Sequence, residues 1–233
     1  MDHIKCNHAI ILAGGFGTRL RAVIEDVPKP MAPINQIPFL HYLLVFVKKN
    51  GISNVTLAVG YKHQNIIQYL GNKYLDIDIT YAIETEPLGT GGAIKQALTG
   101  FENTFVINGD TYFDVDLQHM YAKHLSNHAD ITLALKPMQN FSRYGAVELD
   151  QNKIIAFHEK KQVDFGYING GIYILNQKLF SRMQLPLKFS FETDVLQAHL
   201  KTLHLNGYVS DGYFIDIGIP EDYAKAQIDF KFL

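Results

Sequence analysis

The feature that most constrains the fold is an alternation of apolar runs and helix-period segments in the first half of the chain. Four runs have the composition of strands, and they occupy residues 8–13, 54–60, 78–84 and 104–110. Segments with apolar residues at helical spacing lie between or after them, at residues 39–50, 63–70 and 90–100. The first run, HAIILA, is apolar almost throughout, which is typical of a parallel strand buried on both faces. Strands that alternate with helices predict an α/β fold with a doubly wound, mostly parallel sheet and right-handed crossovers.

The pattern changes after about residue 130. In the stretch YGAVELDQNKIIAFHEK, apolar and polar residues alternate on both sides of residues 150–152, which predicts a β-hairpin. A further strand is expected at 169–175, and helices are expected at 117–128, 176–183, 191–204 and 220–229. The second half of the sheet is therefore predicted to be antiparallel or mixed. We find no linker, repeat or low-complexity segment, so we expect one domain over residues 1–233, with halves 1–130 and 131–233.

Charge and hydropathy exclude several function classes. The formal net charge is −2, so the chain lacks the basic field that holds nucleic acid or an anionic membrane. No apolar run approaches the roughly 20 residues that span a bilayer, and the first residues do not resemble a signal peptide. We therefore expect a cytoplasmic protein. The single cysteine, Cys6, excludes an internal disulfide, and we expect it to be inert.

A glycine turn follows the first predicted strand, in the sequence AGGFGTR. Glycines at this place allow the backbone N–H groups to approach a phosphate, although a simple tight turn is the alternative. Leu20 replaces the third glycine of the dinucleotide fingerprint, and no Gly-Lys-Ser/Thr follows for a phosphate-binding P-loop. Thr18, Arg19 and Lys29 add a hydroxyl and two cations, and prolines flank Lys29 on both sides. This combination favours a phosphate site over a turn.

Six motifs in series resemble those of the sugar-1-phosphate nucleotidylyltransferases, also called nucleotide-sugar pyrophosphorylases. LAGGFGTRL followed by PKPM is similar to the family's signature, and EPLGTGGA at 86–93 is similar to its base-contacting loop. NGD at 108–110, FHEK at 157–160, NGGIYIL at 169–175 and FIDIGIPEDY at 214–223 follow in the family's order. The resemblance covers residues 8 to about 229. It implies the family's Rossmann-like, nucleotide-diphospho-sugar transferase type of fold.

The resemblance also implies a reaction. A sugar 1-phosphate oxygen would attack the α-phosphorus of a nucleoside triphosphate and expel pyrophosphate. Two unit charges 4 Å apart repel by about 4 kcal/mol at an effective dielectric constant of 20, so cations are needed to bring the anions together. By resemblance, Asp110 and Asp216 would hold Mg²⁺, Arg19 would bind the leaving pyrophosphate, and Lys29 would reach the reacting phosphates. Lys160 would hold the sugar phosphate. Arg19, Lys29 and Asp110 are thus the expected catalytic residues.

The expected substrate contacts form two groups. The nucleotide group comprises Leu12, Ala13, Gly14, Gly15, Gly17, Thr18, Glu86, Leu88, Gly89 and Thr90. The sugar-phosphate group comprises Tyr144, Gly145, Glu159, Lys160, Asn169 and Gly170. Glu86 or Glu84 has the chemistry to accept hydrogen bonds from guanine N1 and N2, but both fit equally well as surface charges at a strand end. Tyr144 fits equally well as a core residue.

The DxD triplet, the assignment of catalysis itself and a pair of histidines each have an alternative interpretation. Asp114 and Asp116 form a DxD triplet, which could indicate a metal-dependent glycosyltransferase, although Asp116 also suits the N-cap of the helix expected at 117–128. A catalytically silent regulator that binds nucleotide-sugar is a second alternative, and the presence of all the charged residues argues against it. His124 and His128 lie one helical turn apart without a third ligand, so we expect them on a solvated face.

Three departures from the family pattern refine the prediction. Lys161 stands where a proline is common, so either lysine of the pair could bind the phosphate, and Ile219 stands where threonine is frequent. We expect no left-handed β-helix of the kind that many relatives carry, because the sequence ends soon after residue 229, and no coiled coil indicates an oligomeric state. FSFETDVL, GYFIDIGIPEDY and KPMAPINQIPFL look most like the bacterial D-glycero-α-D-manno-heptose 1-phosphate guanylyltransferases, which make GDP-heptose for capsule or surface glycans. This favours GTP and a heptose 1-phosphate as substrates, with another hexose phosphate or base as the alternative.

Overall fold

A computed structural model describes residues 5–15 and 27–231 of the chain. Ten strands of this described part form one mixed sheet, in the order β10-β11-β13-β9-β12-β7-β1-β4-β6-β5. Its parallel centre consists of β7 (Asn103–Asn108), β1 (His8–Leu12), β4 (Asn54–Val59) and β6 (Ile77–Ile83). All four were predicted from the apolar runs. The doubly wound α/β fold is confirmed.

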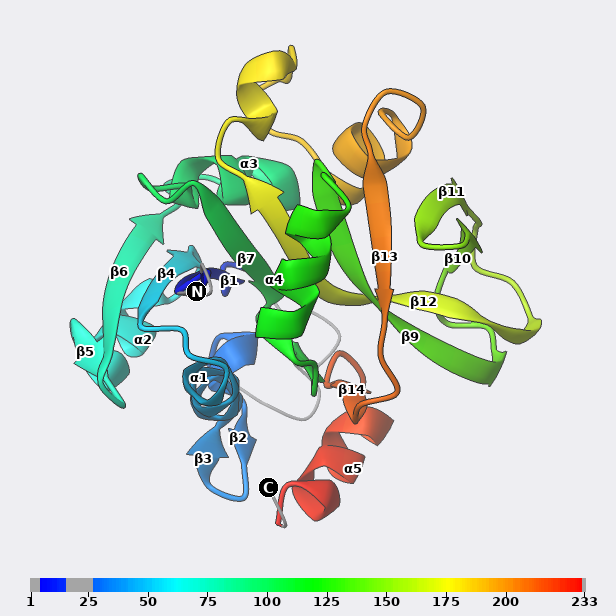
Figure 1. Ribbon diagram of the computed structural model, residues 1–233. Coiled ribbons are helices and arrows are strands. Elements are labelled where there is room, and N and C mark those ends of the chain that lie inside the picture. Colours follow the sequence, from blue (N-terminus) through cyan, green and yellow to red (C-terminus); the bar gives the residue numbers. More distant parts are fainter. Residues whose placement is uncertain (1–4, 16–26, 232–233) are drawn as a thin grey trace.

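Helices cover both faces of the sheet. One core contains side chains of α1 (Phe39–Lys49), α2 (His63–Leu70), α4 (Leu117–Ser126) and α5 (Pro220–Asp229). The other contains side chains of α3 (Gly89–Ala97) and of the π-helical segment η3 (Phe191–Gln197). Ile11 of β1 packs into the first core and Ile10 into the second, as expected for neighbouring residues of a strand buried on both faces. Figure 1 shows α4, in green, lying across one face of the sheet.

The second half of the chain extends the sheet and makes it mixed. β9 (Ile131–Phe141) pairs antiparallel with β12 (Val163–Asn176) and parallel with β13 (Leu205–Val209). The predicted hairpin is present as β10 (Ala146–Asp150) and β11 (Lys153–Phe157), at the opposite end of the sheet from β5 (Lys73–Tyr74) (Figure 1). The expected strand at 169–175 is the second half of the longer β12.

Two predicted helices are wrong in form. The segment expected as helix 176–183 contains only a 3₁₀ turn, η2 (Leu179–Arg182), because Asn176 turns the chain by accepting the N–H of Lys178 (2.9 Å). The segment expected as helix 191–204 forms η3 and then irregular turns. Its backbone bonds are spaced unevenly, since the N–H of Ala198 reaches the carbonyl of Thr193 (3.1 Å).

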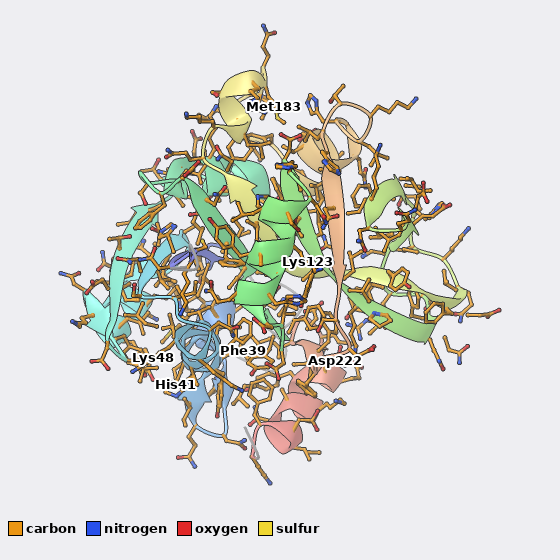
Figure 2. The ribbon with its side chains drawn as sticks, in the orientation of Figure 1. Phe39, His41, Lys48, Lys123, Met183 and Asp222 are labelled. Carbon is orange, nitrogen blue, oxygen red and sulfur yellow. The ribbon has the colours of Figure 1, made fainter. Side chains whose placement is uncertain are left out.

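Five short elements of the described chain complete the fold: two strand pairs and a 3₁₀ helix. β8 (Thr111–Phe113) pairs antiparallel with β14 (Phe214–Asp216), and β2 (Pro33–Ile34) pairs with β3 (Ile37–Pro38) after the 3₁₀ helix η1 (Lys29–Met31). Figure 2 labels Phe39 in the interior between α1 and α5, where its ring lies 5.9 Å from that of Phe230. In the described part of the chain, no helix has both the length and the apolar character needed to cross a membrane.

Candidate active site

A cavity of about 810 Å³ opens where the four central parallel strands end. Residues just after β1, β4, β6 and β7 line it, among them Gly14, Gly60, Glu84 and Gly109. These strands are paired in register, so their carboxyl ends meet along one edge of the sheet. This is the edge at which open α/β sheets bind ligands. The volume is within the range of pockets that hold drug-sized or nucleotide-sized ligands.

Gly109 fixes the turn that presents Asp110. Its N–H donates to the carbonyl of Leu12 (3.0 Å), and a Cβ at this position would stand 2.3 Å from that carbonyl oxygen. A real Cβ does not approach a backbone oxygen so closely, and therefore only glycine fits here. The turn after β7 is thus pressed against the end of β1, and the side chain of Asp110 lines the cavity.

An acidic pair and a lysine meet beside this turn. The Nζ of Lys29 donates to Oδ2 of Asp110 at 2.5 Å, and Asp216 is opposite Thr111 in the β14–β8 pair. The N–H of Ile217 donates to the carbonyl of Asp110 (3.0 Å), which holds the two strand ends together. The short β14–β8 pair is therefore what brings residues 110 and 216 to one place.

Gly218 packs against both Asp216 and Lys29. Its N–H donates to Oδ1 of Asp216 (2.8 Å), and a Cβ here would lie 2.7 Å from that oxygen and 3.0 Å from the Nζ of Lys29. Burial raises the pKa of Asp216, and the neighbouring negative charge of Asp110 raises it further. The arrangement therefore gathers two carboxylates that repel each other and would be stabilised by a cation between them.

The loop that begins at Glu84 forms one wall of the cavity. Oε2 of Glu84 accepts the N–H of Leu88 (3.0 Å), and a Cβ at Gly14 would lie 2.7 Å from Oε1. Glu84 is half-buried, and it lies against the ends of β1 and β4, because a Cβ at Gly60 would stand 3.8 Å from its Cβ. Glu86, by contrast, is exposed, although it also lines the cavity. Of the two glutamates considered for base contact, Glu84 is the one with a fixed orientation.

The residues expected to bind the sugar phosphate lie outside the walls of this cavity. Tyr144 is half-buried with its ring centre 6.0 Å from that of Phe214, and burial, followed by the charge of Asp216, raises its pKa to about 12. It therefore lies next to the acidic pair. Glu159 and Lys160 are exposed after β11, as is Lys161.

Two glycines near these residues are required by packing. A Cβ at Gly145 would lie 2.6 Å from the carbonyl of His158, and one at Gly170 would lie 2.4 Å from the ring of Phe113. Asn169 precedes Gly170 on β12, and its side chain is held by hydrogen bonds to Tyr173 OH (2.8 Å) and from the N–H of Gly171 (3.0 Å). Gly170 thus supports the site by packing, whereas Asn169 is held in one orientation.

The expected nucleotide contacts are largely brought together. The cavity is lined by Leu12, Gly14, Gly15, Glu86, Gly89 and Thr90 of this group, and also by the expected catalytic residues Lys29 and Asp110. Ala13 and Leu88 are buried beside it, and the N–H of Ala13 donates to the carbonyl of Ala58 (2.7 Å). Gly17, Thr18 and Arg19 lie outside the described residues.

The sequence missed other residues of this region. Residues 60–63 follow β4 and line the cavity, and the strand-end rule that selected Gly14 would have found them. Arg143 binds Asp222 of α5 at 2.6 Å, and Figure 2 labels Asp222 at the start of that helix. The guanidinium of Arg143 also lies 5.3 Å from the ring centre of Tyr144. Glu192 lines the cavity from a segment about a hundred residues away from Thr90. It belongs to the FSFETDVL segment noted in the sequence, which did not by itself assign it to the site.

The alternatives for the other polar motifs are resolved by position. Asp116 caps α4 by accepting the N–H of His119 (2.9 Å), as predicted. Asp114 and Asp116 line a different, smaller hollow with Lys5 and Lys49, which removes the DxD triplet from the main cavity. The predicted solvated position of His124 is wrong. Its side chain is buried against Thr132 (2.9 Å), and burial lowers its pKa to about 4.

A comparison with protein families agrees with this geometry. The model of the family described as "Nucleotidyl transferase" matches residues 8–231. The chain belongs to the nucleotidyl transferase family. The family prediction made from the six motifs is confirmed, and the glycosyltransferase alternative is excluded.

Two relatives and one solved structure are similar to this nucleotidyl transferase over nearly its whole length. A D-glycero-alpha-D-manno-heptose 1-phosphate guanylyltransferase of Aneurinibacillus thermoaerophilus is 54% identical over 225 residues, which cover 96% of this chain and 98% of that protein. The enzyme of the same name from Campylobacter jejuni is 51% identical, with 95% and 99% covered. The crystal structure of HddC from Yersinia pseudotuberculosis complexed with GMP-PN has a TM-score of 0.86 and 38% identity, with 97% and 100% covered.

Proposed function

We propose that this protein transfers GMP from GTP to D-glycero-α-D-manno-heptose 1-phosphate, giving GDP-heptose and pyrophosphate. The observation that carries the proposal is identity above one half, over nearly the full length of both chains, to two enzymes of that name. The structure of HddC with GMP-PN supports a guanine nucleotide as the donor. The half-buried carboxylate of Glu84 in the cavity wall agrees chemically with that donor.

The proposed mechanism is an in-line displacement at the α-phosphorus. An oxygen of the sugar 1-phosphate attacks, the bond to the β-phosphate oxygen breaks, and pyrophosphate leaves with its electron pair. No covalent intermediate on the protein is needed, because positioning and charge stabilisation account for most of the catalysis in transfers of this kind. Lys29 is the cation that we assign to the reacting phosphates, since its Nζ already lies 2.5 Å from Asp110 at the cavity wall. Arg19, from the signature, is assigned to the leaving pyrophosphate.

Asp110 and Asp216 would hold Mg²⁺. Two close carboxylates, one of them with a raised pKa, are a donor set that fits a hard cation which prefers oxygen ligands. When bound, the ion supplies positive charge that neutralises the phosphate oxygens and orients them. The role of the chain is to keep both carboxylates in place, through the β14–β8 pair and the hydrogen bond from Gly218.

Guanine selection is assigned to Glu84. Guanine presents two adjacent donors, N1–H and the N2 amino group, and a carboxylate is an acceptor for both. Oε2 of Glu84 is oriented by the N–H of Leu88, so the carboxylate keeps one direction without ligand. The other predicted nucleotide contacts, including Gly89 and Thr90, would hold the base and ribose against the loop.

We propose that residues 131–233 bind the sugar phosphate, and residues 1–130 the nucleotide. Tyr144 lies next to the acidic pair and would cover the sugar ring, while Asn169 and Glu159 supply amide and carboxylate groups for its hydroxyls. Lys160 would bind the phosphate, and adjacent Lys161 is the second candidate. The product would serve capsule or surface glycan synthesis, with the reaction in the cytoplasm.

The test is pyrophosphate release from purified protein with Mg²⁺, over a grid of five nucleoside triphosphates and several sugar 1-phosphates. We expect the highest kcat/KM for GTP with the heptose 1-phosphate, and a lower value for mannose 1-phosphate. A higher value for another sugar or base would replace that substrate in the proposal. Release of no pyrophosphate in any combination would contradict catalysis altogether and favour a silent nucleotide-sugar binder.

A further inference from the structure

Glu192 is a carboxylate of the cavity wall that the proposed mechanism does not use. It lies on η3, about a hundred residues from Thr90 in sequence, yet Thr90 Oγ1 donates to its Oε2 at 2.8 Å. Ser190 Oγ donates to the same oxygen at 3.2 Å. The hydroxyl of Tyr173, on β12, donates to Oε1 at 3.4 Å. The one side chain therefore contacts both the base loop and the strand that carries Asn169.

The connection to the base loop is extensive. Thr90 Oγ1 accepts the N–H of Phe191 (2.9 Å) while it donates to Glu192. The backbone of residues 88–91 is bonded to Phe189 in both directions, at 3.0 Å each. A Cβ at Gly91 would lie 2.2 Å from the ring of Phe189, so the two segments are packed without a gap. The orientation of the Thr90 hydroxyl is therefore set by the 189–192 segment.

The connection to β12, the strand that carries Asn169, runs through the buried hydroxyl of Tyr173. Tyr173 is only 1% exposed, and burial raises its pKa well above the usual value, so the hydroxyl keeps its proton and can donate it. The Tyr173 hydroxyl accepts a hydrogen bond from Nδ2 of Asn169 (2.8 Å) and donates one to Glu192. Oδ1 of Asn169 accepts the N–H of Gly171 (3.0 Å). The amide of Asn169 is thus held at both ends, and Glu192 terminates the chain of hydrogen bonds.

Only a carboxylate suits this position. Glu192 receives three hydroxyl donors, from Thr90, Ser190 and Tyr173, and donates to none of them. A glutamine would turn one of its two oxygens into a donor, so at least one hydroxyl would lose its acceptor. Tyr173 is the buried donor of the three, and an unpaired buried donor weakens a site more than the lost bond alone would suggest. The negative charge also makes Glu192 unsuitable as a ligand for phosphate.

We propose that Glu192 is a positioning residue that joins the nucleotide subsite to the sugar subsite. It fixes the hydroxyl of Thr90 on one side and, through Tyr173, the amide of Asn169 on the other. The inference rests on the proposed function, which assigns those two residues to the two substrates. Each link acts on a different substrate, and loss of Glu192 breaks both links at once.

The experiment separates the two links by the KM of each substrate. Thr90→Val should raise the KM for GTP roughly tenfold and leave the KM for the heptose 1-phosphate within a factor of two, as for one lost hydrogen bond. Tyr173→Phe should do the reverse. Glu192→Gln should raise both KM values, and Glu102→Gln, an exposed carboxylate outside the cavity, is the matched control that should change neither. Thermal unfolding of each variant checks that it is folded.

Double variants test whether the effects pass through Glu192. In the Glu192→Gln background, Thr90→Val and Tyr173→Phe should add less than a factor of two to the KM that each raises alone. Full multiplication of the effects, or a Glu192→Gln enzyme with both KM values unchanged, would overturn the proposal. If Glu192→Gln does not fold, the opposite KM shifts of Thr90→Val and Tyr173→Phe decide between the two outcomes.

The control for the proposed function is the wild-type enzyme in the same assay. If wild-type protein releases no pyrophosphate from GTP with any sugar 1-phosphate, the proposed function fails. Calorimetric titration of GTP alone and of the heptose 1-phosphate alone then replaces the KM values. A Glu192→Gln protein that binds both compounds as the wild type does would contradict the role of Glu192, as would wild-type protein that binds neither compound.

Discussion

Replacing Glu84 by glutamine is the sharpest test of how the site selects guanine. The substitution keeps size and shape and removes the negative charge. In the wild type the N–H of Leu88 donates to Oε2 of Glu84 at 3.0 Å. The remaining oxygen of the glutamine can still accept this hydrogen bond. The other terminal atom becomes an NH₂ group, which would face the N1–H or N2 amino group of guanine with donor against donor. The base loop should therefore stay folded while its contact with guanine is lost.

The expected magnitude follows from the bonds that change. A hydrogen bond to a charged group contributes about 1.5–3 kcal/mol, and one tenfold rate change corresponds to about 1.4 kcal/mol. Glu84→Gln should therefore lower kcat/KM for GTP roughly 10- to 150-fold. Inosine triphosphate lacks the N2 amino group, so it serves as a second substrate that tests the contact with N2. The wild-type enzyme should prefer GTP over inosine triphosphate, and the variant should lose most of this preference.

Pyrophosphate release at subsaturating nucleotide measures both the loss of kcat/KM for GTP and the preference for GTP over inosine triphosphate. Glu102→Gln, outside the cavity, is the control and should behave as the wild type. Glu86→Gln compares the exposed glutamate of the same loop with Glu84. The reasoning is refuted if Glu84→Gln retains wild-type kcat/KM for GTP, or if the preference over inosine triphosphate disappears with Glu86→Gln instead.

Three further outcomes are expected. Gly218→Ala would place a methyl group 2.7 Å from an oxygen of Asp216, so turnover should fall about 100-fold with little change in melting temperature; wild-type turnover would contradict the assigned geometry. Burial lowers the pKa of His8 and of His124 to about 4. The unfolded chain therefore binds more protons between pH 6.5 and 4, and urea unfolding should show a stability loss of about 2 kcal/mol per histidine from pH 7.5 to 5; a flat profile in that window would speak against neutral buried rings. Lys160→Ala should raise the KM for the sugar 1-phosphate at least tenfold with kcat little changed, and an unchanged KM would shift the assignment to the neighbouring lysine.

The parallel half of the fold could be predicted from the sequence because its strands are buried on both faces. Such strands read as continuous apolar runs, and the observed β1 (His8–Leu12) and β4 (Asn54–Val59) agree with the predicted runs to within one residue. β9 (Ile131–Phe141) was missed. Lys136 and Pro137 interrupt its apolar pattern, and its pairing with β12 and β13 determines its conformation instead.

The two misassigned helices show the same tertiary control. Residues 176–183 carry apolar side chains at helical spacing, but the N–H of Gln177 is bonded to the carbonyl of Glu102 (3.0 Å) in the neighbouring chain segment. Ser190 does cap the start of η3, by accepting the N–H of Thr193 (3.2 Å). Regular helical bonding nevertheless stops within two turns, in the segment that contacts the base loop. These contacts join residues far apart in sequence, so no local pattern reports them.

The residues of the candidate site also fall into those that a motif predicts and those that only contacts between distant segments show. Gly14, Asp110 and Asp216 were predicted because each follows a strand or belongs to a recognisable motif. Glu84 was considered together with Glu86, and only the structure distinguishes them, by the bond to Leu88 and by the deeper burial of Glu84. Glu192 lies in the FSFETDVL segment that carries the resemblance, but the sequence assigned it no role, because its contacts are hydroxyl groups from two other segments. Motif spacing indicates which chemistry is present, whereas the packing of distant segments decides which residues orient it.

The most direct test of the central claim follows the label of the transferred phosphate. With GTP labelled at the α-phosphate, heptose 1-phosphate and Mg²⁺, the label should appear in GDP-heptose, whereas label at the γ-phosphate should appear in pyrophosphate. Asp110→Asn should reduce both signals by at least 100-fold while the protein remains folded. Label from the α-phosphate that stays in GMP or GDP without sugar, or an Asp110→Asn protein with wild-type transfer, would contradict a guanylyl transfer centred on this site.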